Sequence, residues 1–217
     1  MKYFFIDAKY KEKIKLGKKI VDKLPQKVGL ITTIQFINSV EDIKKEIEAS
    51  GRVVKVSKGK QKNCGQVLGC ESSAAKEVSE KVNSILYIGT GKFHPMNAAM
   101  ETGKEVHSYN PITKVLKELD LTELNKIEKK KQGAYLKFLG SENIGILVTT
   151  KPGQNDIKKA FKLKEKLEKE GKKAYVFIDN TYNLQSLEDF NFIESWVNTA
   201  CPRIIEDFTC VNINDVL

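Results

Sequence analysis

Short apolar segments rich in β-branched residues alternate with helix-like segments along almost the whole chain. Continuous apolar runs are typical of parallel strands buried on both faces, with helices as the crossover connections. The expected strands lie at 3–6, 28–32, 53–56, 85–88, 105–109, 144–148, 174–178, 196–198 and 211–213. The expected helices lie at 40–49, 72–82, 95–102, 156–170 and 184–190. The pattern predicts the α/β class, with mostly parallel sheets flanked by helices.

A Lys- and Glu-rich segment interrupts this alternation and divides the chain. The segment, 113–139, predicts a long helix that connects an α/β domain at 1–112 to another at 140–217. The two domains are expected to be related, because Gly-Leu-Ile-Thr-Thr at 29–33 parallels Gly-Ile-Leu-Val-Thr-Thr at 145–150. In such sheets ligand sites lie at the carboxyl ends of the strands.

The charge of the chain narrows the classes of partner. Of the 37 basic residues, 35 are Lys and only Arg52 and Arg203 are Arg, in a chain of 217 residues with a net charge of +9. Arg is the residue favoured for reading bases and phosphates, whereas Lys interleaved with Glu is typical of solvated helix faces. We therefore do not expect specific nucleic-acid binding. Steering of the protein to an acidic macromolecular partner stays open.

The sequence shows neither a membrane span nor a signal peptide. No apolar stretch approaches the roughly 20 residues that a transmembrane helix needs, and the N-terminal residues lack a signal-peptide pattern. We expect a cytoplasmic protein. In a reducing compartment its four cysteines are expected to be buried, catalytic or metal-binding rather than disulfide-bonded.

Two cysteine signatures follow strand-like segments about 130 residues apart. They are Gly-Gln-Val-Leu-Gly-Cys, ending at Cys70, and Asn-Thr-Ala-Cys-Pro-Arg, which contains Cys201 and Arg203. Both are expected at strand ends, where their thiols could reach one shared site between two domains and hold a cluster or a metal. The alternative for each cysteine is a small buried hydrophobic residue, and for Arg203 an ordinary ion pair.

The other two cysteines fit no metal-binding spacing. Cys64 lies six residues before Cys70, and Cys210 lies nine after Cys201. Neither spacing is that of a zinc finger or of a bacterial ferredoxin. Cys64 is the better candidate for an additional cluster ligand, because it shares the loop of Cys70.

Two further turns are candidates for ligand contact. Gly89, Thr90 and Gly91 form a glycine-rich turn, with His94 close behind, that suits backbone approach by a nucleotide or a carboxylate. The turn matches neither dinucleotide-binding nor Walker A patterns. The corresponding loop of the second half contains Lys151, Gly153 and Gln154, which could contact an anionic group or form a simple β-turn. A structural histidine is the alternative for His94.

In this order and spacing, the stretches 65–70, 89–95, 149–154 and 198–203 resemble the diphthamide biosynthesis family, the 2-(3-amino-3-carboxypropyl)histidine synthases. The resemblance runs from about residue 27 to about residue 203. It implies a noncanonical radical enzyme in which three cysteines hold a 4Fe-4S cluster and one iron binds S-adenosylmethionine. It also implies transfer of a 3-amino-3-carboxypropyl group to a histidine of translation elongation factor 2.

The resemblance also assigns residues. Cys70 matches the family's middle cluster cysteine and Cys201 its last, and the turns at 89–91 and 149–154 match segments that line the cofactor cleft. Family members have three related domains, and the first, with the first cluster cysteine, is not matched in this sequence. Cys64 or a partner chain is then expected to supply the third ligand.

Two functions follow as expectations. The first is an S-adenosylmethionine-dependent transferase with a cluster held by Cys70, Cys201 and Cys64. Its ligand contacts are expected from Gly89, Thr90, Gly91, His94, Lys151, Gly153, Gln154 and Arg203. The alternative is a noncatalytic, cluster-free scaffold or partner subunit of a complete synthase. A homodimer, or a heterodimer with a related subunit, is the implied assembly.

Overall fold

The computed structural model describes residue 4, residues 6–69 and residues 71–217, with the side chains of Leu121 and Glu206 excepted. Contacts divide the chain into a first unit, Met1–Leu121, and a second unit, Thr122–Leu217. Two of the four residues of the strand expected at 3–6, residues 3 and 5, lie outside this description. Phe4 and Ile6, which are described, have no regular structure.

The first unit contains a five-stranded sheet in the order β2-β1-β3-β4-β5. Its first four strands are parallel and β5 is antiparallel to β4. The strands are β1 (Lys27–Thr32), β2 (Val53–Lys55), β3 (Ser84–Ile88), β4 (Glu105–Asn110) and β5 (Val115–Glu118). The helices are α1 (Lys18–Val21), η1 (Ile34–Ser39), α2 (Val40–Glu48), α3 (Ser73–Ser79) and α4 (Phe93–Thr102).

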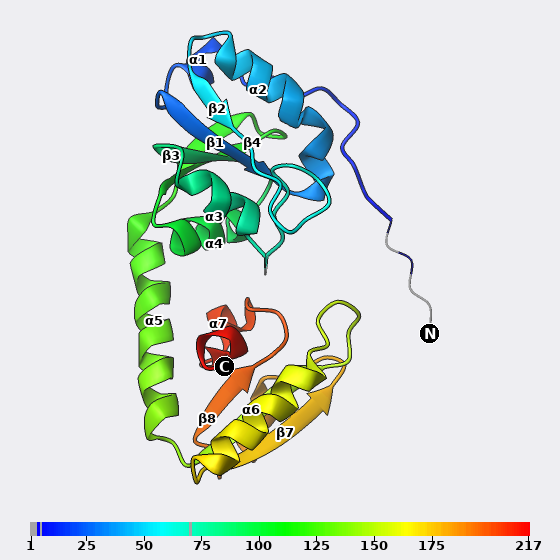
Figure 1. Ribbon diagram of the computed structural model, residues 1–217, viewed down its shortest axis with the longest axis vertical. Coiled ribbons are helices and arrows are strands. Elements are labelled where there is room, and N and C mark those ends of the chain that lie inside the picture. The colour runs from blue at the N-terminus through cyan, green and yellow to red at the C-terminus, as the bar shows by residue number, and fades with distance from the viewer. Residues whose placement is uncertain (1–3, 5, 70) are drawn as a thin grey trace. The chain divides into compact units, whose positions relative to one another are not determined.

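Helices cover both faces of this sheet, which explains the continuous apolar strands (Figure 1). Val28 and Leu30 of β1 pack with Ile43 of α2 in one core. Gly29 faces the other side, where a Cβ atom would lie 2.8 Å from a methyl group of Val78 on α3. Because neighbouring residues of a strand point to opposite faces, both faces of β1 are buried.

The second unit contains a four-stranded parallel sheet in the order β7-β6-β8-β9. Its strands are β6 (Asn143–Thr149), β7 (Lys173–Asp179), β8 (Ser195–Asn198) and β9 (Val211–Asn212). Its helices are α6 (Ile157–Lys169), η2 (Gln185–Asp189), α7 (Ile204–Asp207) and η3 (Ile213–Asp215), together with most of α5 (Leu121–Gly140). Leu163 of α6 packs on Ile146 on one face of the sheet, and Trp196 packs with Leu147 on the other.

The α/β class with two mostly parallel sheets flanked by helices is therefore confirmed. One prediction within it is wrong. A helix was expected to begin near residue 113, but α5 begins at Leu121, because Val115–Glu118 folds back as β5 and pairs with β4. Over the described part of the chain, none of the helices combines the length and apolarity needed to cross a membrane.

Candidate functional site

Each unit has a point where the strand order reverses. The chain goes from β1 outward to β2 and then returns past β1 to β3, and in the second unit it goes from β6 to β7 and returns past β6 to β8. Ligands of parallel α/β sheets bind beside such switch points, at the carboxyl ends of the strands. The loops that follow β1, β3, β6 and β8 are therefore the first places to look for a site.

The loop after β2, which we name the first cysteine loop (residues 56–72, described except for Cys70), is tied to the end of β1. The amide of Thr32 donates to the carbonyl of Gly65 (2.8 Å), and the amide of Val67 donates to the carbonyl of Thr32 (2.8 Å). Gly65 has φ +74°, a conformation that favours glycine. These bonds hold Cys64 beside the switch point with its side chain exposed.

The far end of the first cysteine loop packs on α4. A Cβ atom at Gly69 would clash with the ring of Phe93, in the first turn of α4, so the loop backbone passes directly over that ring. Asn97 of α4 also lies 3.4 Å from the hydroxyl of Ser72. The loop and the start of α4 are thus neighbours. Cys70 itself lies outside the described residues.

Glu71 fastens the same loop to α3. Its carboxylate accepts hydrogen bonds from the amide of Ser73 (2.7 Å) and the side chain of Gln61 (2.9 Å). Partial burial of Glu71 acts to raise the pKa of its carboxyl group, but these hydrogen bonds outweigh burial and hold the pKa below its usual value. Glu71 is therefore an ionised anchor of the loop at neutral pH.

The glycine turn follows β3 and rests on a buried tyrosine. A Cβ atom at Gly89 would clash with the hydroxyl end of Tyr87, whereas at Gly91, with φ +76°, it would meet no atom within 4 Å. Thr90 and Gly91 are exposed. The backbone at Gly91 is therefore open to an approaching ligand, while Gly89 is required by packing.

His94 lies in the first turn of α4, one residue after the helix begins. Its ring stacks on Tyr87, with the ring centres 6.0 Å apart and the planes 9° from parallel. Burial raises the pKa of Tyr87 to about 12, against a smaller opposing effect of its hydrogen bond with Thr33. The tyrosine is thus a neutral support beneath the turn.

The loop after β6 contains Lys151, Gly153 and Gln154. The amide of Lys151 donates to the hydroxyl of Thr149 (3.2 Å), and the amide of Gln154 donates to the carbonyl of Lys151 (3.1 Å). Gly153 has φ +78° and open space around it. These contacts form an ordered turn in which Gln154 is exposed and Lys151 is half-buried.

The second cysteine loop (residues 199–203) is held by the buried side chain of Asn198. The Asn198 amide group donates to the carbonyl of Cys201 and to the side chain of Asn212, both at 3.0 Å, and its oxygen accepts from the amide of Ala200 (2.9 Å). Cys201 is half-buried and Arg203 is exposed. Asn198 therefore positions the loop that presents this thiol.

Thr199 ties the second cysteine loop to β6. Its amide and its hydroxyl both donate to the carbonyl of Leu147, at 3.0 and 2.8 Å. The second cysteine loop and the Lys151 turn thus lie at the same end of neighbouring strands. Asn198 and Thr199 belong to the cysteine signature, but the sequence alone indicates no role for either. The only signal was a pair of polar residues at the end of an apolar strand.

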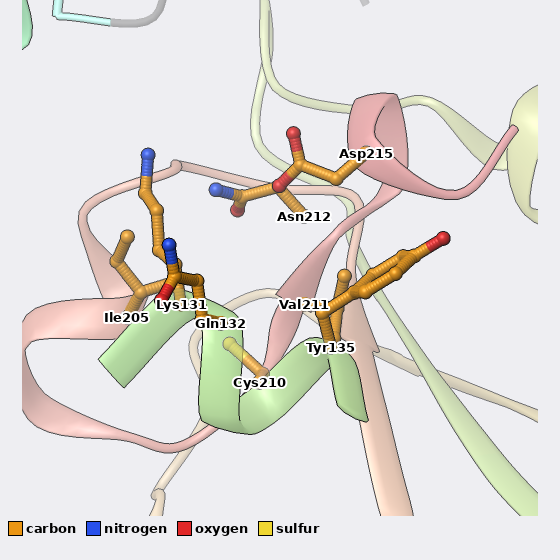
Figure 2. A pocket seen from close by; sticks show the side chains of 8 residues that line it. All are labelled: Lys131, Gln132, Tyr135, Ile205, Cys210, Val211, Asn212 and Asp215. Atoms are coloured by element: carbon orange, nitrogen blue, oxygen red, sulfur yellow. The ribbon is translucent and has the colours of Figure 1, made fainter. Parts of the chain in front are cut away.

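Cys210 behaves differently from Cys64 and Cys201. It is 3% exposed, and burial raises the pKa of its thiol to about 12, partly offset by the charge of Lys130. It lines a cavity of about 320 Å³ in the second unit (Figure 2). The remaining lining residues are Lys131, Gln132, Tyr135, Ile205, Val211, Asn212 and Asp215. None of the predicted site residues is among them.

Loops with thiols, glycines and cations at the switch points of parallel sheets are typical of α/β proteins that bind cofactors or nucleotides. The family to which the chain belongs follows from its sequence. The pattern of the diphthamide synthesis protein family matches residues 1–208, so the chain belongs to that family.

Relatives and solved structures agree with this assignment. The 2-(3-amino-3-carboxypropyl)histidine synthase of Pyrococcus horikoshii is 33% identical over 191 residues, which are 87% of this chain and 54% of that protein. Subunit 1 of the human enzyme is 26% identical over 183 residues, covering 83% of this chain and 40% of that subunit. The chain thus spans about half the length of these relatives, or less.

A solved structure shows the same fold. It is the crystal structure of Dph2 from Pyrococcus horikoshii with a 4Fe-4S cluster, which matches with a TM-score of 0.77 and 31% identity. The match covers 90% of this chain and 57% of that one. The family and the α/β class inferred from the sequence are therefore both confirmed.

Proposed function

We propose that this chain takes part in the transfer of a 3-amino-3-carboxypropyl group from S-adenosylmethionine to a histidine of translation elongation factor 2. The proposal rests on family membership and on the names of the relatives, which are histidine synthases of this kind. The structural observation that carries it is the pair of accessible thiols, Cys64 and Cys201, on ordered loops beside the switch points.

The proposed cluster ligands are Cys70 and Cys201, with Cys64 as the third. Iron–sulfur clusters are held by thiolates, so the ligand side chains must be within reach of the iron. Cys64 is exposed and Cys201 is half-buried, so both fit this requirement. Cys210, with its pKa raised to about 12 by burial, does not. When bound, a 4Fe-4S cluster with one open iron supplies the electron and the coordination position for S-adenosylmethionine.

The proposed role of the other residues is to bind and orient S-adenosylmethionine. The exposed backbone at Thr90 and Gly91 offers amide groups to a polar ligand without a side chain in the way. Lys151 and Arg203 supply cations for the ligand carboxylate. Gly89, His94, Gly153 and Gln154 complete the proposed set.

The proposed assembly has two chains. Several relatives are named subunit 1 of the synthase, which implies that those proteins have a partner subunit. We therefore propose a heterodimer with a related subunit, or a homodimer. The protein substrate would be translation elongation factor 2. The net charge of +9 favours encounter with acidic surfaces, and the proposed location is the cytoplasm.

Anaerobic reconstitution with iron and sulfide tests the cluster. The purified chain is expected to hold close to four irons, to show the absorption and EPR spectra of a 4Fe-4S cluster, and to cleave S-adenosylmethionine when reduced. Cys201→Ser and Cys64→Ser are each expected to lose most of this iron, because thiolate number controls cluster retention. Cys210→Ala is the matched control and is expected to keep it.

Other outcomes would assign other roles. A wild-type chain that stays colourless and leaves S-adenosylmethionine intact would be a noncatalytic subunit of a complete synthase. A chain that retains its iron in Cys64→Ser and turns over only with a second chain would take its third ligand from that partner.

A further inference from the structure

His107 is a buried polar side chain for which the described part of the chain provides no hydrogen-bond partner. It lies in the middle of β4 and is 4% exposed. Both of its ring nitrogens are buried without a hydrogen-bond partner among the described residues. Buried polar atoms in native structures nearly always have partners, because an unsatisfied one costs about 1–3 kcal/mol. We therefore expect the partner of the ring to come from outside the protein, for example a bound ion.

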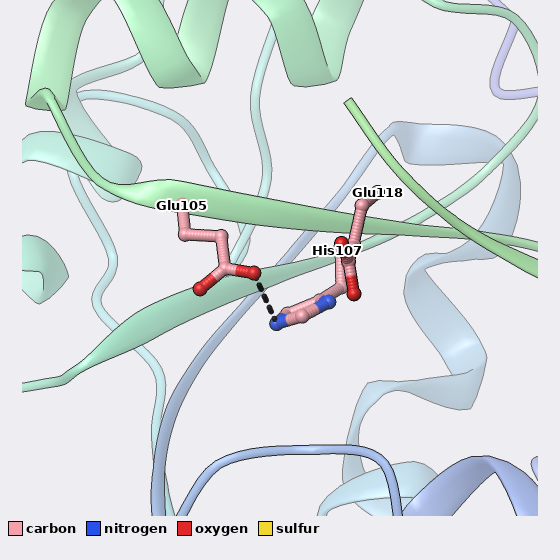
Figure 3. A group of neighbouring side chains, drawn as sticks. All are labelled: Glu105, His107 and Glu118. Atoms are coloured by element: carbon pink, nitrogen blue, oxygen red, sulfur yellow. Dashed lines mark ion pairs between the residues drawn. The ribbon is translucent and has the colours of Figure 1, made fainter. Parts of the chain in front are cut away.

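Two carboxylates flank this ring. Glu105 precedes His107 by two residues, so it shares the same face of β4, and Glu118 of β5 is paired with His107 in the antiparallel register. One ligand atom from each of the three residues lies within 4.8 Å of the other two. Figure 3 shows the carboxylates on either side of the imidazole.

The distance between the His107 ring and the Glu105 carboxylate suits a shared metal ion better than a direct hydrogen bond. Nε2 of His107 lies 3.6 Å from Oε1 of Glu105, which is too long for a hydrogen bond. Two donors that each lie about 2.1 Å from one zinc ion are about 3.4 Å apart in a tetrahedral arrangement. The side chain of Glu105 is 59% exposed and Glu118 is exposed, so both can turn inward slightly and an ion can enter from solvent.

We propose that Glu105, His107 and Glu118 form a binding site for a divalent transition-metal ion, with Zn²⁺ as the preferred ion. One imidazole and two carboxylates are a mixed nitrogen and oxygen donor set of the kind that binds zinc, whereas Mg²⁺ and Ca²⁺ favour oxygen alone. The site contains no thiol, so it is independent of the proposed cluster.

The proposed ion has a structural role. β5 is the edge strand of its sheet, and most of its side chains are exposed, so little apolar burial holds it in place. Glu118 is its last residue, and α5 begins three residues later. An ion bound to β4 through Glu105 and His107 and to β5 through Glu118 would fasten this edge strand.

The test is titration of the full chain with Zn²⁺ and Co²⁺. We expect one ion per chain at this site and a Co²⁺ visible spectrum without the thiolate charge-transfer band that cysteine ligands produce. A hundredfold excess of Zn²⁺ over its dissociation constant is expected to raise the melting temperature by about 5–10 °C, and Mg²⁺ at the same concentration is expected to have little effect.

Glu118→Gln removes one donor and keeps the side-chain shape. It is expected to weaken Zn²⁺ binding at least tenfold, whereas the matched control Glu80→Gln, at an exposed position of the same unit, is expected to leave it unchanged. Because Glu118 is exposed, the variant is expected to fold. A Co²⁺ spectrum showing thiolate ligands alone, no binding, or unchanged affinity in Glu118→Gln would overturn the proposal.

Discussion

The two cysteine loops both follow the carboxyl end of a parallel strand, the first after β2 and the second after β8, but they are held in different ways. The first cysteine loop is fixed by main-chain hydrogen bonds between Gly65, Val67 and Thr32, in effect as an added strand segment beside β1. The second cysteine loop is held mainly by two buried polar residues: Asn198, whose side chain bonds to three partners, and Thr199, whose hydroxyl and amide donate to Leu147. The first cysteine loop is thus held mainly by backbone and the second mainly by side chains.

This difference predicts which kind of substitution destabilises each loop. A loop held by backbone depends on conformation, so it is sensitive to a glycine that adopts positive φ. A loop held mainly by polar side chains depends on the identity of those residues, because removing Asn198 leaves several buried groups unsatisfied at once. Three substitutions test this contrast.

Asn198→Ala is expected to lower the free energy of unfolding of the second unit by about 3 kcal/mol. It removes three hydrogen bonds from a residue that is 1% exposed and leaves their partners without a replacement. Trp196, the single tryptophan, lies two residues away, so urea unfolding followed by its fluorescence measures the loss.

The control for this change is Asn155→Ala, which removes an exposed asparagine that accepts one hydrogen bond from Ile157. It is expected to cost about 1 kcal/mol or less. Equal losses in the two variants would show that Asn198 is not the principal anchor of the second cysteine loop.

Gly65→Ala is expected to destabilise the first cysteine loop by about 2 kcal/mol. An alanine at φ +74° is strained by roughly 1–2 kcal/mol, and its Cβ atom would also lie 3.1 Å from the carbonyl oxygen of Leu30. Hydrogen exchange of the Thr32 and Val67 amides is expected to accelerate about thirtyfold.

Gly91→Ala separates backbone strain from local contact. Gly91 has a similar φ of +76°, but a Cβ atom there would meet nothing within 4 Å. This variant is expected to leave exchange of the Thr32 and Val67 amides nearly unchanged. Similar acceleration in both variants would mean that the loop responds to general weakening of the unit and not to its own backbone bonds.

Glu71→Gln is expected to have the smallest effect, a few tenths of a kcal/mol, because solvent screens this partly exposed carboxylate. The pKa of Glu71 is lowered in the folded state, so its ionised form stabilises the first unit above about pH 4.3, the unfolded value. That contribution is lost as the pH falls through the folded pKa. Urea unfolding of both proteins at pH 7 and at pH 3 is expected to show a difference that shrinks in acid.

The contrast itself was not visible in the sequence, although the fold was. Apolar runs such as 28–32 and 144–148 predicted parallel strands, because burial on both faces leaves a strong local signal. β5 left no such signal. Three of the four side chains of Val115–Glu118 are exposed, so only pairing with β4 makes this segment a strand, and a Lys- and Glu-rich sequence was interpreted as helix.

The same reason explains which site residues were missed. Glycine turns and cysteines are recognisable by residue type, so Gly89, Gly91 and Cys201 were named in advance. Asn198 makes two local hydrogen bonds, with Ala200 and Cys201, but its third bond, to Asn212, joins residues fourteen apart. Glu118 meets His107 only because β5 folds back. Contacts of this kind are set by tertiary structure and leave no local pattern.

The continuity of each unit along the chain has a consequence for synthesis on the ribosome. Every strand of the first sheet comes from residues 27–118, so that sheet can assemble while the second unit is still being translated. The second core buries Val211, Ile213 and Val216 beside β6 and α6. The second core can therefore be completed only after residue 216 has left the exit tunnel. The first cysteine loop can thus be in place well before Cys201 joins a folded unit.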